Sequence, residues 1–275
     1  MKKLGNLEST LGRTARGQDD IHTPHLATTK DVRNRILQWN CRSLRANAAE
    51  LAERLQTMVT LPIAILLQET RGTSPGIAGY QGYFQPSIIH EGTTDPTAQA
   101  AIFIQRNIRR CQSDTTAYCS DTQEVVAVRI DLNSPQKIIL VSAYLCPYGE
   151  RQRRGNFTWM SHLRSLCPSD GILIAGDFNA ANTTWGYGLN TPRGVELERK
   201  TNFANLILLN DLDIPTRVAL HSRQQSTTPD LAWSSHRLMT SWDCEGDPWS
   251  SDHFPIWLTL RTGQNKRKRK VRCTD

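Results

Sequence analysis

A carboxylate and a carboxamide stand directly after an apolar stretch in the second half of the chain. The stretch runs from Ile172 to Ala175, and Asp177 and Asn179 follow it, two positions apart. A carboxylate in such a place can orient and deprotonate a water molecule, while an amide can donate a hydrogen bond to a phosphate oxygen. The pair alone is weak evidence, because Asp and Asn are also common turn formers at strand ends.

Similar polar residues occur at the ends of other apolar segments of the chain. They carry oxygen or nitrogen atoms that bind cations, phosphates or protons, and their gathering at one sheet edge would be an unusual coincidence if all were turn formers. Their types therefore predict one site. These residues are Asn40, Glu69, Tyr144, Asp230, Asp252 and His253.

The carboxylates of this set suit a hard divalent cation. Mg²⁺ takes oxygen ligands, commonly one or two carboxylates together with water and substrate phosphate. Glu69 with Asp252 or Asp177 would supply them. Attack of water on a phosphodiester also needs a group that positions and deprotonates the water, and Asp177 suits that role.

The remaining members suit the phosphate. His253, with Asn179 and Tyr144, can bind the phosphoryl oxygens. A carboxylate bound to one imidazole nitrogen fixes the tautomer of a histidine and raises its pKa. An Asp230–His253 pair would therefore favour a cationic imidazole that faces a phosphate.

Alternating apolar segments must position these residues. Helices are predicted at residues 43–59, with Ser43 as the N-cap, and at 153–166 and 195–210. Many strands with few helices between them favour an α/β fold of two packed β-sheets flanked by helices over a βα barrel. The predicted strands are at residues 35–40, 62–69, 82–87, 100–105, 124–131, 137–145, 171–177, 229–235 and 253–260.

The composition predicts an intracellular protein with one main domain. The 275 residues divide into a flexible leader at 1–33, a domain at 34–261 and a basic, disordered tail at 262–275. Apolar runs are too short to cross a bilayer, and the N-terminal segment has no apolar core of a signal peptide. Seven cysteines without a CxxC pair favour free thiols in a reducing compartment.

The positive charge is concentrated in the tail. The chain has a net charge of +7, and residues 261–275 hold seven Lys or Arg and one Asp. Such a run is a solvated end, a nuclear-import signal or a phosphate-binding arm.

The order of the motifs resembles a known superfamily. Asn40, Glu69 and Tyr144, followed by GDFN, TTPD and SDH, are similar to the endonuclease/exonuclease/phosphatase superfamily. Within it, residues 35–260 most resemble the apurinic-endonuclease-like domain of non-LTR (LINE-type) retrotransposons, with an arthropod-like character in GDFNAANTTWG, STTPDLAW and WSSDHFPIWLTL. The resemblance implies the four-layer α/β sandwich of deoxyribonuclease-like enzymes.

The resemblance also implies the metal half of the site. Glu69 would be the principal metal ligand, and Asn40 would lie beside it and hold the site or a coordinating water. Asp252 would complete the polar cluster near the metal. The implied metal is Mg²⁺, with Mn²⁺ as an alternative.

The same resemblance implies catalytic roles. Asp177 would deprotonate the attacking water, and Asn179 would hydrogen-bond the scissile phosphate. Tyr144 would contact the phosphate or the leaving oxygen. His253 would bind the phosphoryl oxygen or act as the base, with Asp230 accepting its other N–H. Whether Asp177 or His253 takes the proton stays open.

One loop departs from the related domains. Related retroelement domains commonly carry two histidines after GDFNA, and this chain has Ala181 and Asn182 instead. Trp185, a few residues on, is interpreted as a packing residue rather than a base-stacking one. The catalytic series itself is complete.

The implied function is that of an Mg²⁺-dependent DNA endonuclease. It would nick one strand of double-stranded DNA and leave a 3′-hydroxyl that primes reverse transcription. It would act as a monomer with a reverse transcriptase complex as a further partner, in the nucleus or cytoplasm. A phosphatase or phosphodiesterase acting on a non-nucleic-acid ester, and a catalytically silent remnant, are the alternatives. Candidate DNA-binding cations are Arg106, Arg109, Arg110, Arg151, Arg153 and Arg154.

Overall fold

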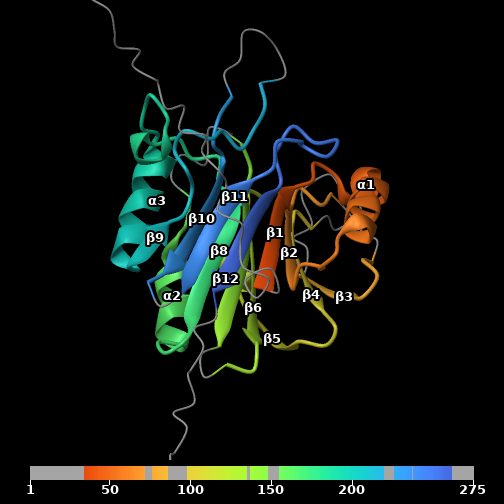
Figure 1. Cartoon of the computed structure of the whole chain (residues 1–275). Coiled ribbons are helices and arrows are strands. Elements are labelled where there is room, and N and C mark those ends of the chain that lie inside the picture. The colour runs from red at the N-terminus through yellow and green to blue at the C-terminus, as the bar shows by residue number, and fades with distance from the viewer. Residues whose placement is uncertain are drawn as a thin grey trace, which may run out of the picture.

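Two six-stranded β-sheets lie face to face in the computed structural model of the chain (Figure 1). The described residues are 34–71, 76–85, 98–134, 137–147, 155–219, 226–236 and 238–261. The predicted leader at 1–33, the predicted tail at 262–275 and the cluster of Arg151, Arg153 and Arg154 lie outside them. The domain boundaries at 34 and 261 stay a prediction.

The first sheet joins both ends of the described chain. Its central strands β1 and β2 pair in parallel, and β12 pairs with β1 in the antiparallel direction. The strand order is β11-β12-β1-β2-β4-β3. The bounds are β1 (Arg35–Asn40), β2 (Ala64–Gln68), β3 (Tyr80–Phe84), β4 (Ala100–Gln105), β11 (Met239–Cys244) and β12 (Ile256–Arg261).

The second sheet has a similar plan. Its central strands β7 and β8 are parallel, and their neighbours β6 and β10 are antiparallel to them. The order is β5-β6-β7-β8-β10-β9. The bounds are β5 (Arg109–Ser113), β6 (Gln123–Asp131), β7 (Ile138–Leu145), β8 (Gly171–Asp177), β9 (Leu206–Leu208) and β10 (Asp230–Ser235).

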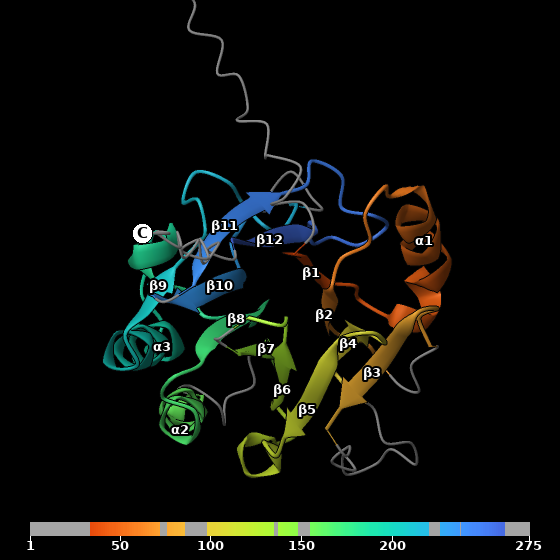
Figure 2. The ribbon, with the colours of Figure 1, turned by 60° about the horizontal axis from the view of Figure 1, so that its bottom comes forward.

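Helices cover the outer faces of the two sheets. Helix α1 (Leu44–Thr57) lies on the first sheet, while α2 (Thr158–Leu166) and α3 (Pro192–Phe203) lie on the second (Figure 2). The layers are therefore helix, sheet, sheet and helices, which confirms the predicted four-layer α/β sandwich. The longest of these helices, α1, has 14 residues, and none in the described part is long and apolar enough to span a bilayer.

The alternation of side chains along each strand builds three apolar layers. In β2, Ile65 and Leu67 pack under α1, whereas Ala64 and Leu66 face the second sheet. Successive side chains of a strand point to opposite faces, so a strand covered on both sides must be apolar throughout. This is why the central strands appear in the sequence as continuous apolar runs.

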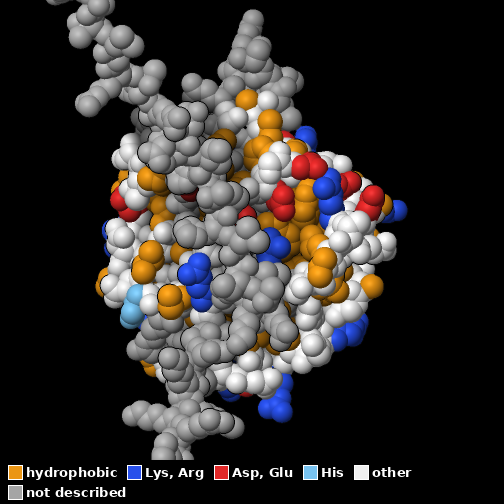
Figure 3. All heavy atoms as spheres, viewed as in Figure 1, with side chains coloured by type: hydrophobic (Ala, Val, Ile, Leu, Met, Phe, Trp, Pro, Cys, Tyr) orange, Lys and Arg blue, Asp and Glu red, His pale blue; other side chains and the backbone are white. Residues whose placement is uncertain are grey.

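The outer face of α1 is charged and paired. Arg54 donates to Glu50 at 2.8 Å and to Asp247 at 2.5 Å. In Figure 3, acidic and basic side chains lie next to one another over this helix. The N-cap is the predicted Ser43, whose Oγ accepts a hydrogen bond from the Ala46 amide. The helix begins where the sequence predicts it, and its polar face is a solvated, neutralised surface.

The structure corrects one predicted helix and adds strands. The helix predicted at 195–210 ends at Phe203, and Leu206–Leu208 form the edge strand β9. Asn205 between them has a φ of 52°, a left-handed conformation that ends a helix. Strands β5 and β11 were not predicted. Trp185 is 1% exposed and packs edge-to-face on Trp233, as its interpretation as a packing residue requires.

Gly176, beside the last residue of β8, allows two strands to approach closely. A Cβ at this position would lie 1.9 Å from the carbonyl oxygen of Ala143 on β7. We expect Gly176→Ala to lower the free energy of unfolding by about 3 kcal/mol or more, because the backbone of a central strand must move. Urea unfolding followed by tryptophan fluorescence measures the change.

Gly188→Ala is the matched control. A Cβ at Gly188 meets no atom within 4 Å, so its unfolding free energy should stay within about 0.5 kcal/mol of the wild-type value. Equal stability of the two variants would contradict the close-approach explanation.

Candidate active site

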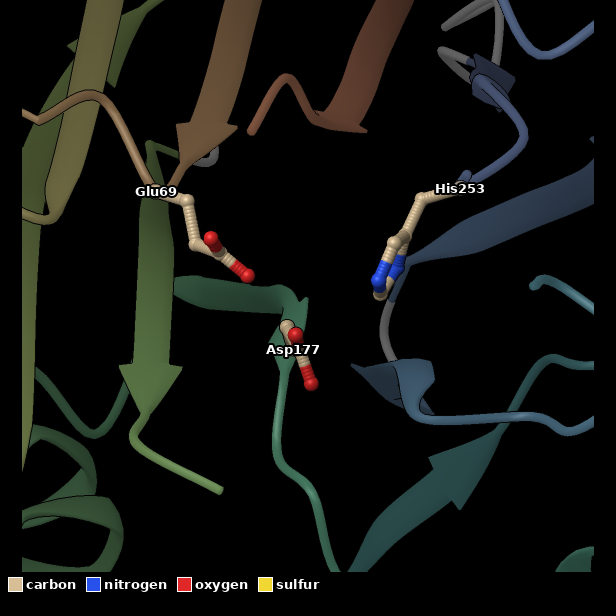
Figure 4. A group of neighbouring side chains, drawn as sticks. All are labelled: Glu69, Asp177 and His253. Carbon is tan, nitrogen blue, oxygen red and sulfur yellow. The ribbon is translucent and has the colours of Figure 1, made fainter. Parts of the chain in front are cut away.

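Three predicted residues from three different segments meet at one edge of the sandwich. Glu69 follows β2, Asp177 ends β8, and His253 precedes β12. One ligand atom of each lies within 4.8 Å of the others. Figure 4 shows both carboxylates and the imidazole ring converging on a shared space. Glu69 and His253 are 184 positions apart in the sequence, and only the sheet topology brings the three residues together.

The inward face of β8 explains the position of Asp177. Alternate residues Leu173 and Ala175 face the first sheet and are apolar, and Asp177 is the next inward position. It pairs with Tyr144 on parallel β7 and with Asp230 on antiparallel β10. The layer between the sheets is thus apolar along most of its length and polar at this edge.

Asn40 connects the two carboxylates. Its Nδ2 donates to Glu69 Oε1 at 3.0 Å and to Asp177 Oδ2 at 2.8 Å. Its own Oδ1 accepts the backbone N–H of Arg42 at 3.1 Å, which fixes the orientation of the amide. Asn40 is fully buried, so it holds Glu69 and Asp177 at a defined separation.

Glu69 has an unusual backbone conformation. Its φ is 50°, and that of Arg71 is 48°. A left-handed residue directly after a strand breaks the alternation, so Glu69 reaches the same amide that Asp177 reaches. The guanidinium of Arg71, which is 54% exposed, donates to Glu69 Oε2. Strain of this kind is commonly retained at functional sites.

His253 is held from behind by a buried carboxylate. Its Nδ1 lies 2.6 Å from Asp230 Oδ2. Asp230 also accepts Thr216 Oγ1 at 3.0 Å and Gln38 Nε2 at 3.1 Å. The exposed fractions of His253 and Asp230 are 3% and 0%. The imidazole therefore has one nitrogen committed to Asp230 and the other available to the site.

The charges around the centre shift two pKa values. Burial lowers the pKa of His253, but the negative charges of Asp230, Asp177 and Asp252 outweigh it and raise this pKa to about 9. Burial, together with repulsion from Asp230, raises the pKa of Asp177 to about 7, although His253 acts in the opposite direction. Near neutral pH, His253 is a cation and Asp177 is able to exchange a proton.

Tyr144 and Asn179 lie beside this group. Burial, followed by the charges of Glu69 and Asp177, raises the pKa of Tyr144, so its hydroxyl stays a neutral donor. Asn179 has a φ of 43°, and its Nδ2 donates to the carbonyl oxygen of Leu145 at 2.9 Å. The structure brings both residues to the edge where β7 and β8 end, and their roles stay predictions.

Asp252 is arranged differently from the other carboxylates. Its Oδ2 accepts Nε and Nη2 of Arg217 at 2.9 and 2.8 Å, and Arg42 Nη1 lies 3.7 Å from Oδ1. Burial would raise the pKa of Asp252, but the hydrogen bond from Arg217 and the charge of His253 lower it. Asp252 is therefore a paired anion, and its predicted part in the metal cluster stays a prediction.

Several residues of the site were missed at the level of sequence. Gln38 is two positions before Asn40 and shares its inward face, so alternation along β1 would have found it. Thr216 and Arg217 lie in an irregular segment after β9 and carry no local pattern. Their contacts to Asp230 and Asp252 are set by the tertiary fold alone.

A buried arginine fastens the loop after β8. Arg193 is 2% exposed, and its Nη1 donates to the carbonyl oxygens of Cys146 and Asn179 at 3.0 and 3.1 Å. Asn182, at the position where related domains carry histidine, is also buried. It caps the turn at Thr184 and donates to Glu198. The loop is thus ordered by polar contacts of its own.

The first predicted arginine cluster lies far from the centre. Arg109 pairs with Asp131 at the end of β6 that is opposite Tyr144, and Arg106 and Arg110 flank the same turn. Arg110 also donates hydrogen bonds to the Tyr83 hydroxyl and to the carbonyl oxygen of Ile108. These residues lie at the edge of the sandwich opposite the site.

The donor set fits a divalent cation. Two carboxylates, from Glu69 and Asp177, converge on one space, and Asn40 holds them together. Such like charges repel one another, and a hard cation with water ligands would relieve that repulsion. The imidazole of His253 is bound to Asp230 and carries a proton at neutral pH, so the carboxylates are the ligands of choice.

Comparisons with known proteins agree with the fold. Residues 138–257 match the model of a protein family described as "Endonuclease-reverse transcriptase". Among solved structures, the endonuclease domain of TRAS1, a telomere-specific non-LTR retrotransposon, is 21% identical, with a TM-score of 0.64 over 83% of this chain and 99% of that one. No curated protein sequence matches the chain.

Two further solved structures share the architecture. An AP endonuclease from Archaeoglobus fulgidus is 14% identical, with a TM-score of 0.57 over 83% of this chain and all of that one. The 3′ phosphatase NExo from Neisseria, bound to a product DNA hairpin, is 14% identical, with a TM-score of 0.56 over 83% of this chain and all of that one. At these identities the likeness confirms the fold alone.

The Asp230–His253 contact predicts a pH effect. Because the folded-state pKa of about 9 lies above the usual 6.5, the charge on His253 stabilises the fold fully below pH 6.5. This contribution is lost as the pH rises through 9. We expect Asp230→Asn to lower the pKa of His253, measured by NMR titration of the imidazole in metal-free protein. Asp211→Asn, an exposed carboxylate, should leave it unchanged, and equal titrations in both variants would contradict the pairing.

Arg71 predicts an effect on cation binding. Its guanidinium occupies Glu69 Oε2, so it competes with a cation for this carboxylate. We expect Arg71→Ala to tighten Mn²⁺ binding on the order of five- to tenfold, as removal of a unit charge a few ångströms away implies. Isothermal calorimetry measures the affinity, with Arg109→Ala as the control. Weaker binding in Arg71→Ala would show that the arginine orients Glu69 instead.

Proposed function

We propose that the chain is a metal-dependent DNA endonuclease of the endonuclease/exonuclease/phosphatase superfamily, because residues 138–257 match the family model described as "Endonuclease-reverse transcriptase". It hydrolyses one phosphodiester bond of double-stranded DNA and leaves a 3′-hydroxyl. The observation that carries the proposal is the convergence of Glu69, Asp177 and His253, with Asp230 behind the imidazole.

Asp177 is the better candidate for the general base. Its pKa of about 7 lets it accept a proton from water near neutral pH. The pKa of His253 is about 9, so its imidazole is protonated and donates a hydrogen bond to a phosphoryl oxygen instead. Asn40 positions Asp177, and Asp230 positions His253, so each of the two groups is held for its own role.

The remaining residues would bind the phosphate. Tyr144 offers a neutral hydroxyl to the phosphate or to the leaving oxygen. Asn179 Nδ2 donates one N–H to the Leu145 carbonyl, and its second N–H would bind the scissile phosphate. Glu69 would hold Mg²⁺ or Mn²⁺, with Asn40 beside it, and Asp177 would stay free to accept the proton. A divalent cation there supplies neutralisation of charge on the phosphoryl group.

The biological role that we propose is target-primed reverse transcription of a retroelement. The family description, and the naming of one similar structure as a retrotransposon endonuclease domain, support this role. The partners would be duplex DNA and a reverse transcriptase complex, and the chain would act as a monomer in the nucleus, where such DNA lies. A 3′ phosphatase shares the fold, so phosphomonoester hydrolysis is the second candidate.

Plasmid nicking tests the proposed function. Supercoiled plasmid incubated with the purified chain and Mg²⁺ should become open circles, and the nicks should be extended by a DNA polymerase because they end in a 3′-hydroxyl. We expect Glu69→Gln and Asp177→Asn to reduce the rate at least about 10²-fold, as loss of a ligand or base does. Arg109→Ala serves as the matched control, and EDTA should abolish the reaction.

The outcomes separate the alternatives. Phosphate release from a small phosphomonoester without nicking would favour the phosphatase. Inertness of the wild type in both assays, with Mg²⁺ or Mn²⁺, would favour a silent remnant. Nicking that survives both substitutions would remove Glu69 and Asp177 from the mechanism.

A further inference from the structure

Both carboxylate oxygens of Asp252 face arginines. One oxygen accepts two N–H groups of Arg217, at 2.9 and 2.8 Å, and the other faces Arg42 at 3.7 Å. The Asp252 side chain is only 5% exposed. Its neighbour His253 belongs to the convergent group with Glu69 and Asp177, but Asp252 does not. This carboxylate therefore organises two arginines beside the catalytic centre.

The two arginines leave positive charge at the surface. The side chains of Arg42 and Arg217 are 52% and 43% exposed, while the single carboxylate that they share is buried. Two guanidinium groups against one carboxylate give a surplus positive charge. Only Nε and Nη2 of Arg217 are used within the described residues, so donors of both side chains face solvent.

The backbone places both arginines firmly at the centre. Arg217 forms a β-bridge with His253, and the bonds from Val218 N to Asp252 O and from Phe254 N to Thr216 O, both 2.8 Å, hold the two segments together. Arg42 follows Asn40 by two residues and has a φ of 55°. The backbone of both arginines is therefore fixed beside the centre.

We propose that Arg42 and Arg217, held by Asp252, form a two-arginine clamp that binds a phosphate of the DNA backbone adjacent to the scissile one. The proposal rests on the proposed function, because it needs a nucleic-acid substrate in the site. The planar guanidinium group binds phosphate oxygens through paired N–H donors. Glu69 and His253 approach the centre from opposite sides in Figure 4, and Arg217 is bridged to His253.

The positive charge of the clamp would offset the repulsion between the carboxylates of the site and the DNA phosphates. DNA carries one negative charge per phosphate, and a centre of carboxylates would repel it. The described arginines of the first predicted cluster lie at the opposite edge and do not offset that repulsion. Asp252 thus acts as a positioning residue for DNA binding, and Glu69 holds the cation.

DNA binding without chemistry tests the clamp. The full chain is titrated, in EDTA, into a fluorescent duplex oligonucleotide over a series of salt concentrations, and anisotropy gives Kd. We expect Arg217→Ala and Arg42→Ala each to weaken binding several-fold and to reduce the slope of log Kd against log salt by about 0.9, the value for one phosphate contact. Arg109→Ala should keep the wild-type slope.

Further variants exclude misfolding and separate the roles. Arg217→Lys keeps the charge, so it should keep most of the slope, while thermal unfolding checks every variant. Asp252→Asn should alter DNA affinity but leave Mn²⁺ affinity within twofold of wild type, whereas Glu69→Gln should lose Mn²⁺ binding. Loss of Mn²⁺ binding in Asp252→Asn would overturn the proposal.

The result for the clamp is distinguishable from that for the proposed function. Wild-type slopes in both alanine variants, with nicking intact, would overturn the clamp alone and leave the arginines as counterions of Asp252. Reduced slopes in a chain that binds DNA but does not nick it would support the clamp and contradict the endonuclease. Absence of duplex binding by the wild type would overturn both.

Discussion

The site depends on one buried carboxylate that is fully satisfied. Asp230 has no exposed surface and accepts hydrogen bonds from Gln38, Thr216 and His253. Removal of one partner from a buried ion pair commonly costs about 3–5 kcal/mol, because the remaining charge is left without compensation. Gln38 belongs to the first sheet and Asp230 to the second, so this carboxylate fixes the two sheets relative to each other and fixes the imidazole of His253 in the same place.

The polar end of the layer between the sheets extends from this carboxylate as a connected network. Gln38 Nε2 also lies 2.8 Å from Gln68 Oε1, and Gln68 Nε2 donates to Ser142 Oγ at 2.9 Å. All three side chains are buried. A hydrogen-bonded interior of this kind allows only one register between the sheets, because a shift would leave several polar groups without partners. The apolar remainder of the layer stabilises the packing of the two sheets, and the polar edge fixes their register.

Arginines at this edge of the sandwich offset the negative charge of the carboxylates, which would otherwise repel a phosphate. Arg71 pairs with Glu69, and Arg42 and Arg217 pair with Asp252. Each arginine keeps a large exposed fraction, so the centre is acidic inside and basic at its mouth. Charge pairing of this type keeps the carboxylates ionised and lowers the repulsion of a phosphate backbone. Under the proposed function, Glu69 would hold the metal ion, and the arginines paired with Asp252 would bind the DNA backbone.

The sequence alone determined the central strands and α1 with its Ser43 cap, and it predicted eight polar residues for the site, because local apolar runs and strand-end residues carry that information. It missed the edge strands β5 and β11, whose residues are largely polar and show no continuous apolar run. It also assigned the apolar β9, Leu206–Leu208, to the end of a helix. Only the tertiary structure decided which carboxylate serves which purpose. Asp177 meets Glu69 through Asn40, while Asp252 meets Arg217, 35 positions away. Such pairings depend on strand order and register, and no local pattern in the chain encodes them.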